Sequence, residues 1–307
     1  LKTLQTLPEA SELIARVENG GCPAVLTGTA PVQRACIGAF AILQRFNDVE
    51  ARQSQLRNQL LHKGYRAKYG FEDVIGESDA IQKAKEVLRR MAVSESPILL
   101  IGETGTGKEL FAHAVHRASR RRNGPFVAIN VAAFPENLLE SELFGYEEGA
   151  FTGAKKGGKM GLFEYAHLGT LFLDEVEAMS PMLQAKLLRV LQEKELIRVG
   201  GDRVIPVDVR IIASSNEDIH ELVRQGRFRK DLFYRLNTLP LEIPPLRERK
   251  RDIRPLVESF LKDMNKKYRY QKRFADAAME ILYSYVWPGN VRELKNVVEQ
   301  AVILSAG

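Results

Sequence analysis

The residues best suited to chemistry lie in a glycine-rich stretch, from Gly102 to Lys108, with the spacing Gly-x-x-x-x-Gly-Lys. A short apolar run at 98–101 precedes it and a helix-forming stretch at 109–116 follows, which indicates a buried strand, a tight loop and a helix. Glycines in such a loop let backbone N–H groups face an anion, and the helix N-terminus favours negative charge. The pattern predicts a phosphate-binding loop in which Lys108 reaches the outer phosphates. A glycine-rich turn without a ligand is the alternative.

The loop departs from the general pattern at one position. In most phosphate-binding loops the lysine is followed by Ser or Thr, whose hydroxyl binds magnesium. Here Glu109 follows Lys108. We therefore expect magnesium to depend on another acid or on water.

A second apolar stretch, 170–173, ends in two acids, Asp174 and Glu175. In an open parallel sheet, ligands lie at the carboxyl ends of the strands, so these acids are expected near the phosphates. Asp174 would hold magnesium, directly or through water, and Glu175 would orient or activate the attacking water. A pair of acids that only caps a helix N-terminus is the alternative.

Other polar residues fall where they could reach the same phosphates. Asn130 ends an expected strand at 126–130, and Asn216 follows another at 209–214; each residue type is also common in turns. Arg292 lies in the first turn of a helix that Asn290 and Glu293 begin in the manner of a capping box. A cation there opposes the helix dipole, and an anionic ligand would remove that cost. We predict that Arg292 faces the phosphates; a surface salt bridge is the alternative.

Glycines and lysines surround a single aromatic residue, Phe151, between 145 and 159. A packed core gains little from this composition. The stretch predicts a mobile loop that presents Phe151 to a partner, and a plain solvated loop is the alternative.

Composition sets broad limits on the class of protein. The chain has 307 residues, 45% of them hydrophobic and 27% charged, with a net charge of +6 that permits an acidic partner without requiring one. Cys22 and Cys36 form neither a metal spacing nor a disulfide framework, so we expect a reducing cytoplasm. No apolar run approaches the roughly 18 residues of a membrane span and no signal peptide is visible, so no membrane partner is expected.

Hydrophobic patterning divides the chain further. Residues 1–45, with short strands at 22–26 and 37–43, are expected to be the tail of an upstream domain, and 46–67 a linker helix that is either solvated or dimerising. Alternating strands and helices over 68–245 predict the α/β class, with a parallel sheet sandwiched by helices and strands at 98–101, 126–130, 170–173, 209–214 and 239–243. Apolar helical spacing predicts a small helical domain over 246–307, in which Ala278, Ile281 and Leu282 begin one apolar helix face. The chain begins at Leu1 rather than Met, and we expect a fragment of a longer protein.

Together these motifs resemble the central ATPase domain of sigma-54-dependent transcriptional activators, the bacterial enhancer-binding proteins of the AAA+ class, from about Phe71 to Leu304. Other matches are 143–145, 228–232, 246–249 and 287–294, and Ile75 resembles the entry to the adenine pocket more weakly. The most specific match is the loop Gly149, Ala150, Phe151, Thr152, Gly153, Ala154. The family's phosphate loop, including the acid after the lysine, is matched by Gly102, Glu103, Thr104, Gly105, Thr106, Gly107, Lys108 and Glu109.

The resemblance implies an AAA+ P-loop fold with a helical lid, and ATP and Mg²⁺ as cofactors. It implies a ring, usually a hexamer, with ATP at the subunit interfaces and a dimer as the inactive form. Arg229 and Arg235 resemble arginine fingers that reach the neighbour's γ-phosphate, and Asn130 resembles the switch residue that engages Glu175. Phe151 and Thr152 resemble the residues that contact sigma-54, and the implied work is remodelling of the closed sigma-54 RNA polymerase–promoter complex.

The sequence also departs from the family. Glu177 stands where the family often has glycine, which affects local motion after the strand. The family's C-terminal helix-turn-helix is absent from these residues, so binding to promoter-upstream DNA is expected of a domain outside this chain, and the N-terminal tail faintly resembles the end of a PAS-type sensor. Another kind of AAA+ motor and a nucleotide-switched binding module without turnover are the alternative functions.

Overall fold

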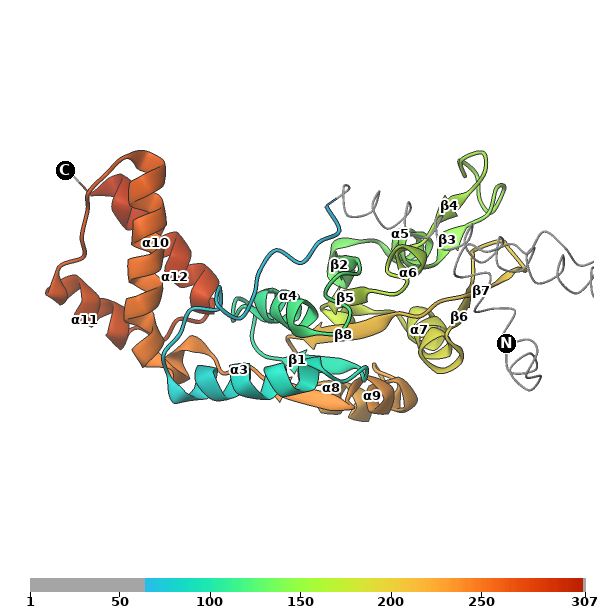
Figure 1. Ribbon diagram of the computed structural model, residues 1–307, viewed down its shortest axis with the longest axis horizontal. Helices are drawn as coiled ribbons and strands as arrows, with labels where there is room; N and C mark the ends of the chain where they lie inside the picture. The colour runs from blue at the N-terminus through green and yellow to red at the C-terminus, as the bar shows by residue number, and fades with distance from the viewer. Residues whose placement is uncertain (1–63, 306–307) are drawn as a thin grey trace, which may run out of the picture. The chain divides into compact units, whose positions relative to one another are not determined.

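The computed structural model describes residues 64–305 (Figure 1). The strands expected at 22–26 and 37–43, the two cysteines and the linker helix up to residue 63 lie outside the described residues. Contacts between backbone positions divide the chain into Leu1–Leu56 and Arg57–Gly307, and the second unit holds everything described below. Across 64–305, no helix combines the length and the apolar character needed to cross a membrane.

A five-stranded sheet forms the centre of this unit, with the strand order β2-β5-β8-β1-β9 and all neighbours parallel. The strands are β1 (Ile98–Ile101), β2 (Phe126–Asn130), β5 (Thr170–Asp174), β8 (Arg210–Ser215) and β9 (Leu239–Glu242). The predicted α/β class and the parallel sheet are confirmed, with strand ends that differ from the prediction by at most one residue. The order places the carboxyl ends of β5, β8 and β1 side by side, which is where the sequence puts its acids and its glycine-rich loop.

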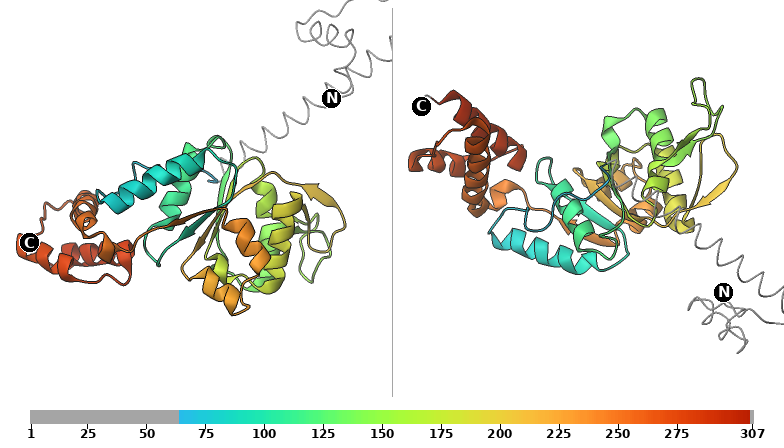
Figure 2. Two further views of the ribbon diagram at one scale, coloured as in Figure 1. Left: turned by 90° about the horizontal axis from the view of Figure 1, so that it is seen from below. Right: turned by 45° about the horizontal axis from the view of Figure 1, so that its top comes forward.

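Helices cover both faces of the sheet (Figure 2). Strand side chains alternate between the two faces, so Leu99 and Leu171 pack into one apolar core while Leu100 and Phe172 pack into another. The first core also receives α5 (Glu136–Phe144), α6 (Leu162–Tyr165), α7 (Pro181–Glu193), α8 (Ile219–Arg224) and α9 (Lys230–Leu236). The second receives α3 (Asp79–Ala92) and α4 (Lys108–Ala118).

Two antiparallel hairpins and two 3-10 turns interrupt the alternation of strands and helices. The hairpins are β3 (Gly145–Tyr146) with β4 (Lys159–Met160), and β6 (Glu195–Ile197) with β7 (Val204–Pro206). The turns η1 (Val131–Ala133) and η2 (Val176–Ala178) directly follow β2 and β5. Each turn therefore begins at the edge of the sheet where the predicted site lies.

The helical region contains η3 (Leu246–Glu248), η4 (Lys250–Asp252), α10 (Ile253–Tyr268), α11 (Asp276–Ser284) and α12 (Asn290–Leu304) around a third apolar core. The indole N–H of buried Trp287 donates to the carbonyl of Leu282 at 2.8 Å, which holds α11 against the turn before α12. The prediction for Ile281 was wrong, because this side chain is 68% exposed while Met279 and Leu282 face the core. Most positions of this nine-residue helix are apolar, so their spacing alone does not fix which side is buried.

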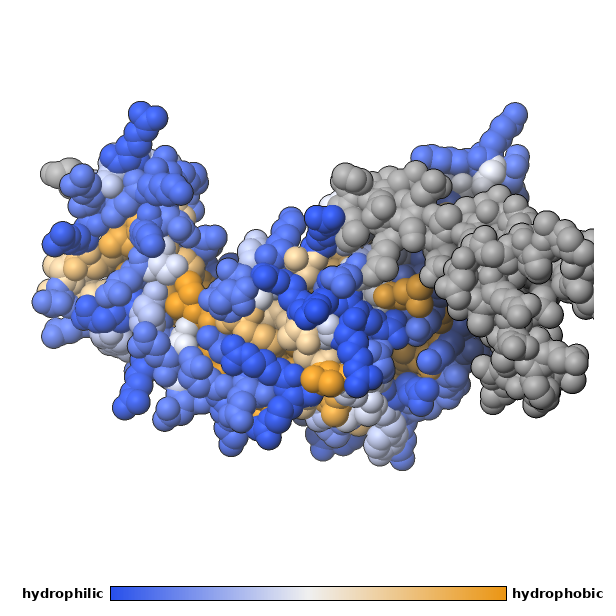
Figure 3. All heavy atoms as spheres, viewed as in Figure 1, coloured by the Kyte–Doolittle hydropathy of each residue, from blue (hydrophilic) through white to orange (hydrophobic). Residues whose placement is uncertain are grey.

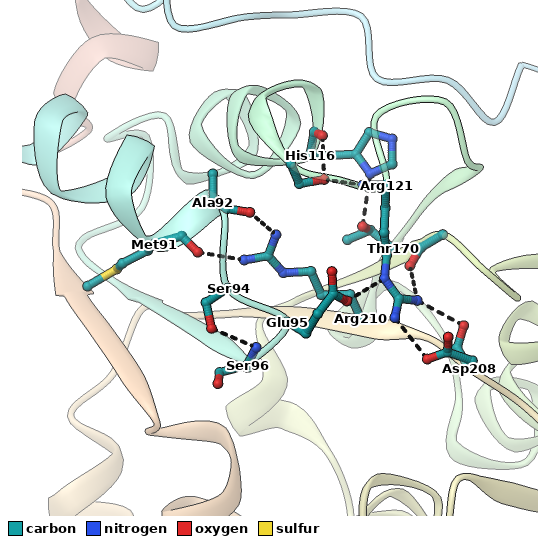
Figure 4. A network of polar contacts seen from close by, with 12 residues as sticks. Met91, Ala92, Ser94, Glu95, Ser96, His116, Arg121, Thr170, Asp208 and Arg210 are labelled. Atoms are coloured by element: carbon teal, nitrogen blue, oxygen red, sulfur yellow. Dashed lines mark hydrogen bonds and ion pairs between the residues drawn. The ribbon is translucent and has the colours of Figure 1, made fainter.

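At the amino end of the sheet, charged side chains tie helix ends to strands (Figure 4). The guanidinium of buried Arg210 donates to the carbonyls of Met91 and Ala92 at 3.0 and 2.8 Å, at the C-terminus of α3, where helix carbonyls lack partners. Burial lowers the pKa of Arg210 to about 10. Arg121 pairs with Glu95 at 2.6 Å and Asp208 at 2.8 Å. This network fixes the end of the sheet away from the predicted site.

His116 in the same network makes stability depend on pH. Its Nδ1 lies 2.8 Å from the Thr170 hydroxyl, and burial lowers its pKa from 6.5 to about 4. Between pH 6.5 and pH 4, His116 is protonated in the unfolded chain but neutral in the folded chain. Its contribution to the free energy of unfolding is therefore fully present above about pH 6.5 and is lost as the pH falls toward 4. We expect His116 to remove about 3 kcal/mol of unfolding free energy between pH 7 and pH 4.

Urea unfolding of the wild type and of His116→Gln at both pH values measures this contribution. The difference between the two proteins in the pH dependence of the unfolding free energy isolates His116, because the carboxylates contribute equally to both. Identical pH dependence in the two proteins would mean that His116 titrates normally in the folded state.

Candidate active site

The phosphate-loop lysine lies against the ends of two strands. Lys108 begins α4, directly after Gly107, whose φ of 101° places it in the left-handed region that favours glycine. The ammonium Nζ of Lys108 donates to the carbonyls of Gly102 and Glu103, at 2.6 and 3.1 Å, and to Oδ1 of Asn216. Burial lowers the Lys108 pKa, and the carboxylates of Asp174, Glu177 and Glu175 oppose that shift. The glycine-rich loop and the acidic strand end therefore meet in one place.

A buried serine joins the two acids at that place. The Ser214 hydroxyl, on β8, donates to Asp174 Oδ1 and accepts the backbone N–H of Glu175 at 3.4 Å. Glu175 has a φ of 57°, which is uncommon for a residue other than glycine and costs on the order of 1 kcal/mol. This left-handed turn directs the chain from β5 into η2. Ser214 was not among the predicted site residues; the available signal was a serine at the end of an apolar strand, two residues before Asn216.

The helical region is hydrogen-bonded to the phosphate loop through Glu103. Its carboxylate accepts two hydrogen bonds from the Arg247 guanidinium, at 2.7 and 2.8 Å, and a third from the Asn290 amide at 3.1 Å. These donors lower the Glu103 pKa. The backbone N–H of Val291 donates to the Gly105 carbonyl at 3.0 Å. A Cβ on Gly105 would lie 2.3 Å from a backbone carbonyl oxygen, so only glycine permits this approach.

The predicted start of α12 was partly wrong. Gly289, not Asn290, is the N-cap residue, and its N–H donates to the Glu293 carboxylate at 2.8 Å. The Asn290 side chain instead accepts the Leu246 N–H at 2.7 Å and donates toward Glu103. An asparagine near a helix start is typical of a cap, and sequence spacing does not reveal a partner 44 residues away.

Arg292 and Glu109 flank the loop. The Cβ of Arg292 lies 3.2 Å from the point where a Cβ on Gly105 would stand, and the side chain is exposed. Its charge also contributes to the lowered pKa of Lys108, so the guanidinium belongs to the same electrostatic environment. The Glu109 carboxylate, 65% exposed, lies 3.8 Å from His113 Nε2, one helical turn further along α4.

Two further predicted residues lie at the margins of the site. Asn130 is directly opposite Asp174 in the β2–β5 register, and its Oδ1 accepts the Ala133 N–H at 3.2 Å, which caps η1. Ile75 is partly buried against the helical core. The expected engagement of Asn130 with Glu175 stays a prediction.

The two predicted arginine fingers lie on the exposed side of α9. Arg229 is the N-cap residue, and its guanidinium binds Asp231 at 2.8 and 3.1 Å. Its backbone N–H donates at 2.7 Å to Gln184, which is fully buried in α7. The Arg235 guanidinium donates to the Leu191 carbonyl at 3.1 Å. The backbone is thus firmly held while both guanidinium groups face solvent.

The loop between β3 and β4 projects from the rest of the fold (Figure 1). In the same view its tip forms a largely hydrophilic surface (Figure 3). Phe151 is 44% exposed, and its ring lies 4.9 Å from that of Tyr146 at the base of the loop. A Cβ on Gly149 or Gly153 would meet nothing within 4 Å, so the tip has free space around both glycines, whereas Ala150 lies close to Gly200.

The base of this loop rests on the neighbouring hairpin region. The Glu147 N–H donates to the Val199 carbonyl at 3.0 Å, and the Val199 N–H donates to the Gly145 carbonyl at 2.9 Å. Arg198 binds Glu164 at 2.7 and 2.9 Å and Glu147 at 3.2 Å. Hydrogen bonds and ion pairs therefore hold the base of the loop, while Phe151 near its tip is exposed.

Comparison with protein families matches residues 74–242 to the family described as "Sigma-54 interaction domain". The chain belongs to this family of sigma-54 activators. Residues 247–307 match "AAA+ ATPase lid domain", which covers the helical region described above. The resemblance read from the sequence is confirmed.

Curated relatives agree with this assignment. The chain is 49% identical, over 84% of its length, to the Nif-specific regulatory protein of Azotobacter vinelandii, and covers 50% of that protein. It is 46% identical, over 87% of its length, to the regulatory protein AtoC of Escherichia coli, and covers 57% of it. The chain thus spans about half the length of these relatives.

Among solved structures, the chain is similar to NtrX from Brucella abortus in complex with ATP. The sequences are 37% identical and the TM-score is 0.72, over 87% of this chain and 56% of NtrX. The AAA+ P-loop NTPase fold with its helical lid is therefore shown on both sequence and structure.

Proposed function

We propose that this chain binds and hydrolyses ATP, and that it uses the hydrolysis to remodel the closed sigma-54 RNA polymerase–promoter complex. The observation that carries the proposal is the convergence of Lys108, Asp174 and Glu175 at one edge of the sheet. The same chain carries the projecting loop 149–154, whose sequence resembles the family's sigma-54 contact, and the family match supports this partner. The crystallised relative NtrX binds ATP, which supports the same ligand here.

In the proposed mechanism the Lys108 ammonium exchanges its hydrogen bonds to the loop carbonyls for contacts with the outer phosphates. The Asn216 side chain, no longer bound to Lys108, then contacts the γ-phosphate. Glu175 orients the attacking water and takes up its proton. Arg292, beside the loop, neutralises phosphate charge. The remaining loop residues supply backbone donors, and the helix N-terminus at Lys108 adds favourable potential.

The carboxylates fit a magnesium ion. Mg²⁺ usually binds one or two carboxylates together with substrate phosphates and water, and Asp174 offers such a carboxylate beside the phosphate loop. Among residues 64–305, no group of three or more His, Cys, Asp or Glu side chains converges on one point. Asp174 would hold the ion, directly or through water, and the bound ion would neutralise charge that develops on the phosphates.

We further propose that Arg229 and Arg235 complete the site of a neighbouring copy in a ring, usually a hexamer, with a dimer as the inactive form. Both guanidinium groups are exposed and stand on an anchored helix. A finger supplied in trans stabilises the charge of phosphoryl transfer. Hydrolysis would then require assembly.

We propose that the segment from Asn130 to β3 transmits a change of bound nucleotide to the sigma-54 loop. Asn130 ends β2 opposite Asp174 and caps η1, and α5 leads directly from there into β3. A change in the partner of Asn130 would alter η1 and so the base of the loop. We propose that Gly149–Ala154, with Phe151 and Thr152 at the tip, bind sigma-54.

The remaining expectations are proposals for the whole protein. They are an ATPase domain over 68–245, a lid over 246–307, an upstream sensor, a DNA-binding domain outside this chain, and cytoplasmic localisation. The first two regions carry the residues of the proposed chemistry, Lys108, Asp174 and Glu175 in one and Arg292 in the other, whereas the sensor and the DNA-binding domain contribute none of them.

Promoter opening tests this function. The chain, sigma-54 holoenzyme and a promoter fragment are mixed with ATP or with a non-hydrolysable analogue, and single-stranded thymines are detected with permanganate. We expect the promoter to open with ATP and to stay closed with the non-hydrolysable analogue. ATP hydrolysis without any opening would exclude sigma-54 remodelling and favour another kind of AAA+ motor.

A further inference from the structure

Glu177 links the two strand ends that carry the site. It lies in η2, two residues after Glu175, and its Oε1 accepts the backbone N–H of Asn216 at 3.0 Å. Asn216 follows β8, and its side-chain Oδ1 accepts a hydrogen bond from Lys108. The carboxyl of Glu177 therefore connects the turn after β5 with the residue that contacts the phosphate-loop lysine.

The other oxygen of this carboxyl is poorly satisfied. Oε2 of Glu177 is buried and has no hydrogen-bond partner among residues 64–305. Burial raises the pKa of Glu177 and the neighbouring Glu175 adds to the rise, while hydrogen bonds, above all that from the Asn216 N–H, oppose it. A buried acceptor without a partner costs stability. Such a group is poorly explained by stability alone, and groups of this kind concentrate at functional sites.

No other polar side chain in the described region holds the Asn216 N–H. The next turn is closed separately, because the Ser215 hydroxyl donates to the Glu217 carbonyl at 2.8 Å and accepts the Glu217 N–H at 3.2 Å. Glu177 is thus the side-chain restraint on the backbone from which the Asn216 amide projects. Glycine at position 177 would leave that restraint out.

We propose that Glu177 is a positioning residue for ATP hydrolysis, which fixes the backbone of Asn216 so that the amide side chain meets the γ-phosphate when Lys108 moves to the phosphates. This inference rests on the proposed ATPase function. In this role Glu177 acts through the backbone of Asn216 and not on the nucleotide itself.

Steady-state ATP hydrolysis by the full chain tests this role. In Glu177→Ala we expect kcat to fall about tenfold and KM to change less than about twofold, because misplacement affects the transition state more than ground-state binding. Glu177→Gln keeps an acceptor for the Asn216 N–H, and we expect it to restore kcat to within about threefold of the wild type. Glu217→Gln, at an exposed carboxyl beside Asn216, is the matched control and should behave like the wild type.

Binding of a fluorescent ATP analogue separates this inference from the proposed function. Suppose that the wild type binds the analogue and hydrolyses ATP, and that Glu177→Ala has the same kcat. This result would overturn the role of Glu177 and leave the ATPase proposal standing. A wild type without binding or turnover would overturn both. If Glu177→Ala does not fold, Glu177→Asp withdraws the carboxyl by one methylene; a wild-type kcat in that variant would equally overturn the role.

Discussion

Replacing Glu175 with glutamine should abolish ATP hydrolysis and leave ATP binding in place. Glutamine keeps the size of the side chain, so the left-handed turn at Glu175 and its bond to Ser214 can persist. The amide cannot accept the proton of the attacking water, and loss of a general base costs about 100-fold or more in rate. The phosphate contacts come from the loop and Lys108, which this substitution leaves untouched.

Phosphate release and the affinity for a fluorescent ATP analogue measure the two halves of this prediction. Glu86→Gln, at an exposed carboxyl on α3, provides a control for the loss of one negative charge. Normal turnover in Glu175→Gln would remove Glu175 from its role. Loss of binding would show that the residue acts on nucleotide affinity instead.

The second large effect concerns the projecting loop. Thr152→Ala should leave ATP hydrolysis within about twofold of the wild type and lower the affinity for sigma-54 by at least about tenfold. Thr152 is exposed on a loop that projects from the fold (Figure 1), so truncation of its side chain should not disturb the sheet edge. Binding and hydrolysis are thus expected to separate in this variant.

Capture of sigma-54 in the presence of a transition-state nucleotide analogue measures the loss. ATP hydrolysis by the same preparation is the internal control, because it shows that the site is intact. Capture at the wild-type level would refute the assignment of the loop. A loss of both capture and hydrolysis would place Thr152 in the nucleotide mechanism.

Local patterns predicted the elements that bear the chemistry. The apolar run before Gly102 and the acids after 173 are short-range signals, and parallel strand topology brings them to one edge without further information. The sheet, its flanking helices and the convergence of Lys108 with Asp174 and Glu175 could therefore be read from the sequence.

Contacts between distant residues could not be predicted in this way. The Glu103–Arg247 pair joins positions 144 residues apart, and its geometry depends on how the helical region meets the loop. The left-handed backbone of Glu175 is imposed by the turn into η2, because the intrinsic preference of glutamate opposes it. Glu177 was noted only as a departure from the family, and its bond to Asn216 depends on strand order.

The specific ATPase rate as a function of chain concentration tests most directly whether this chain is an ATPase whose sites are completed between copies. We predict a steep rise of the rate per chain with concentration, and a rate for Arg229→Ala that stays low even where sedimentation shows assembly. An appreciable rate that does not change with concentration, in a chain that sediments as a monomer, would contradict this mechanism.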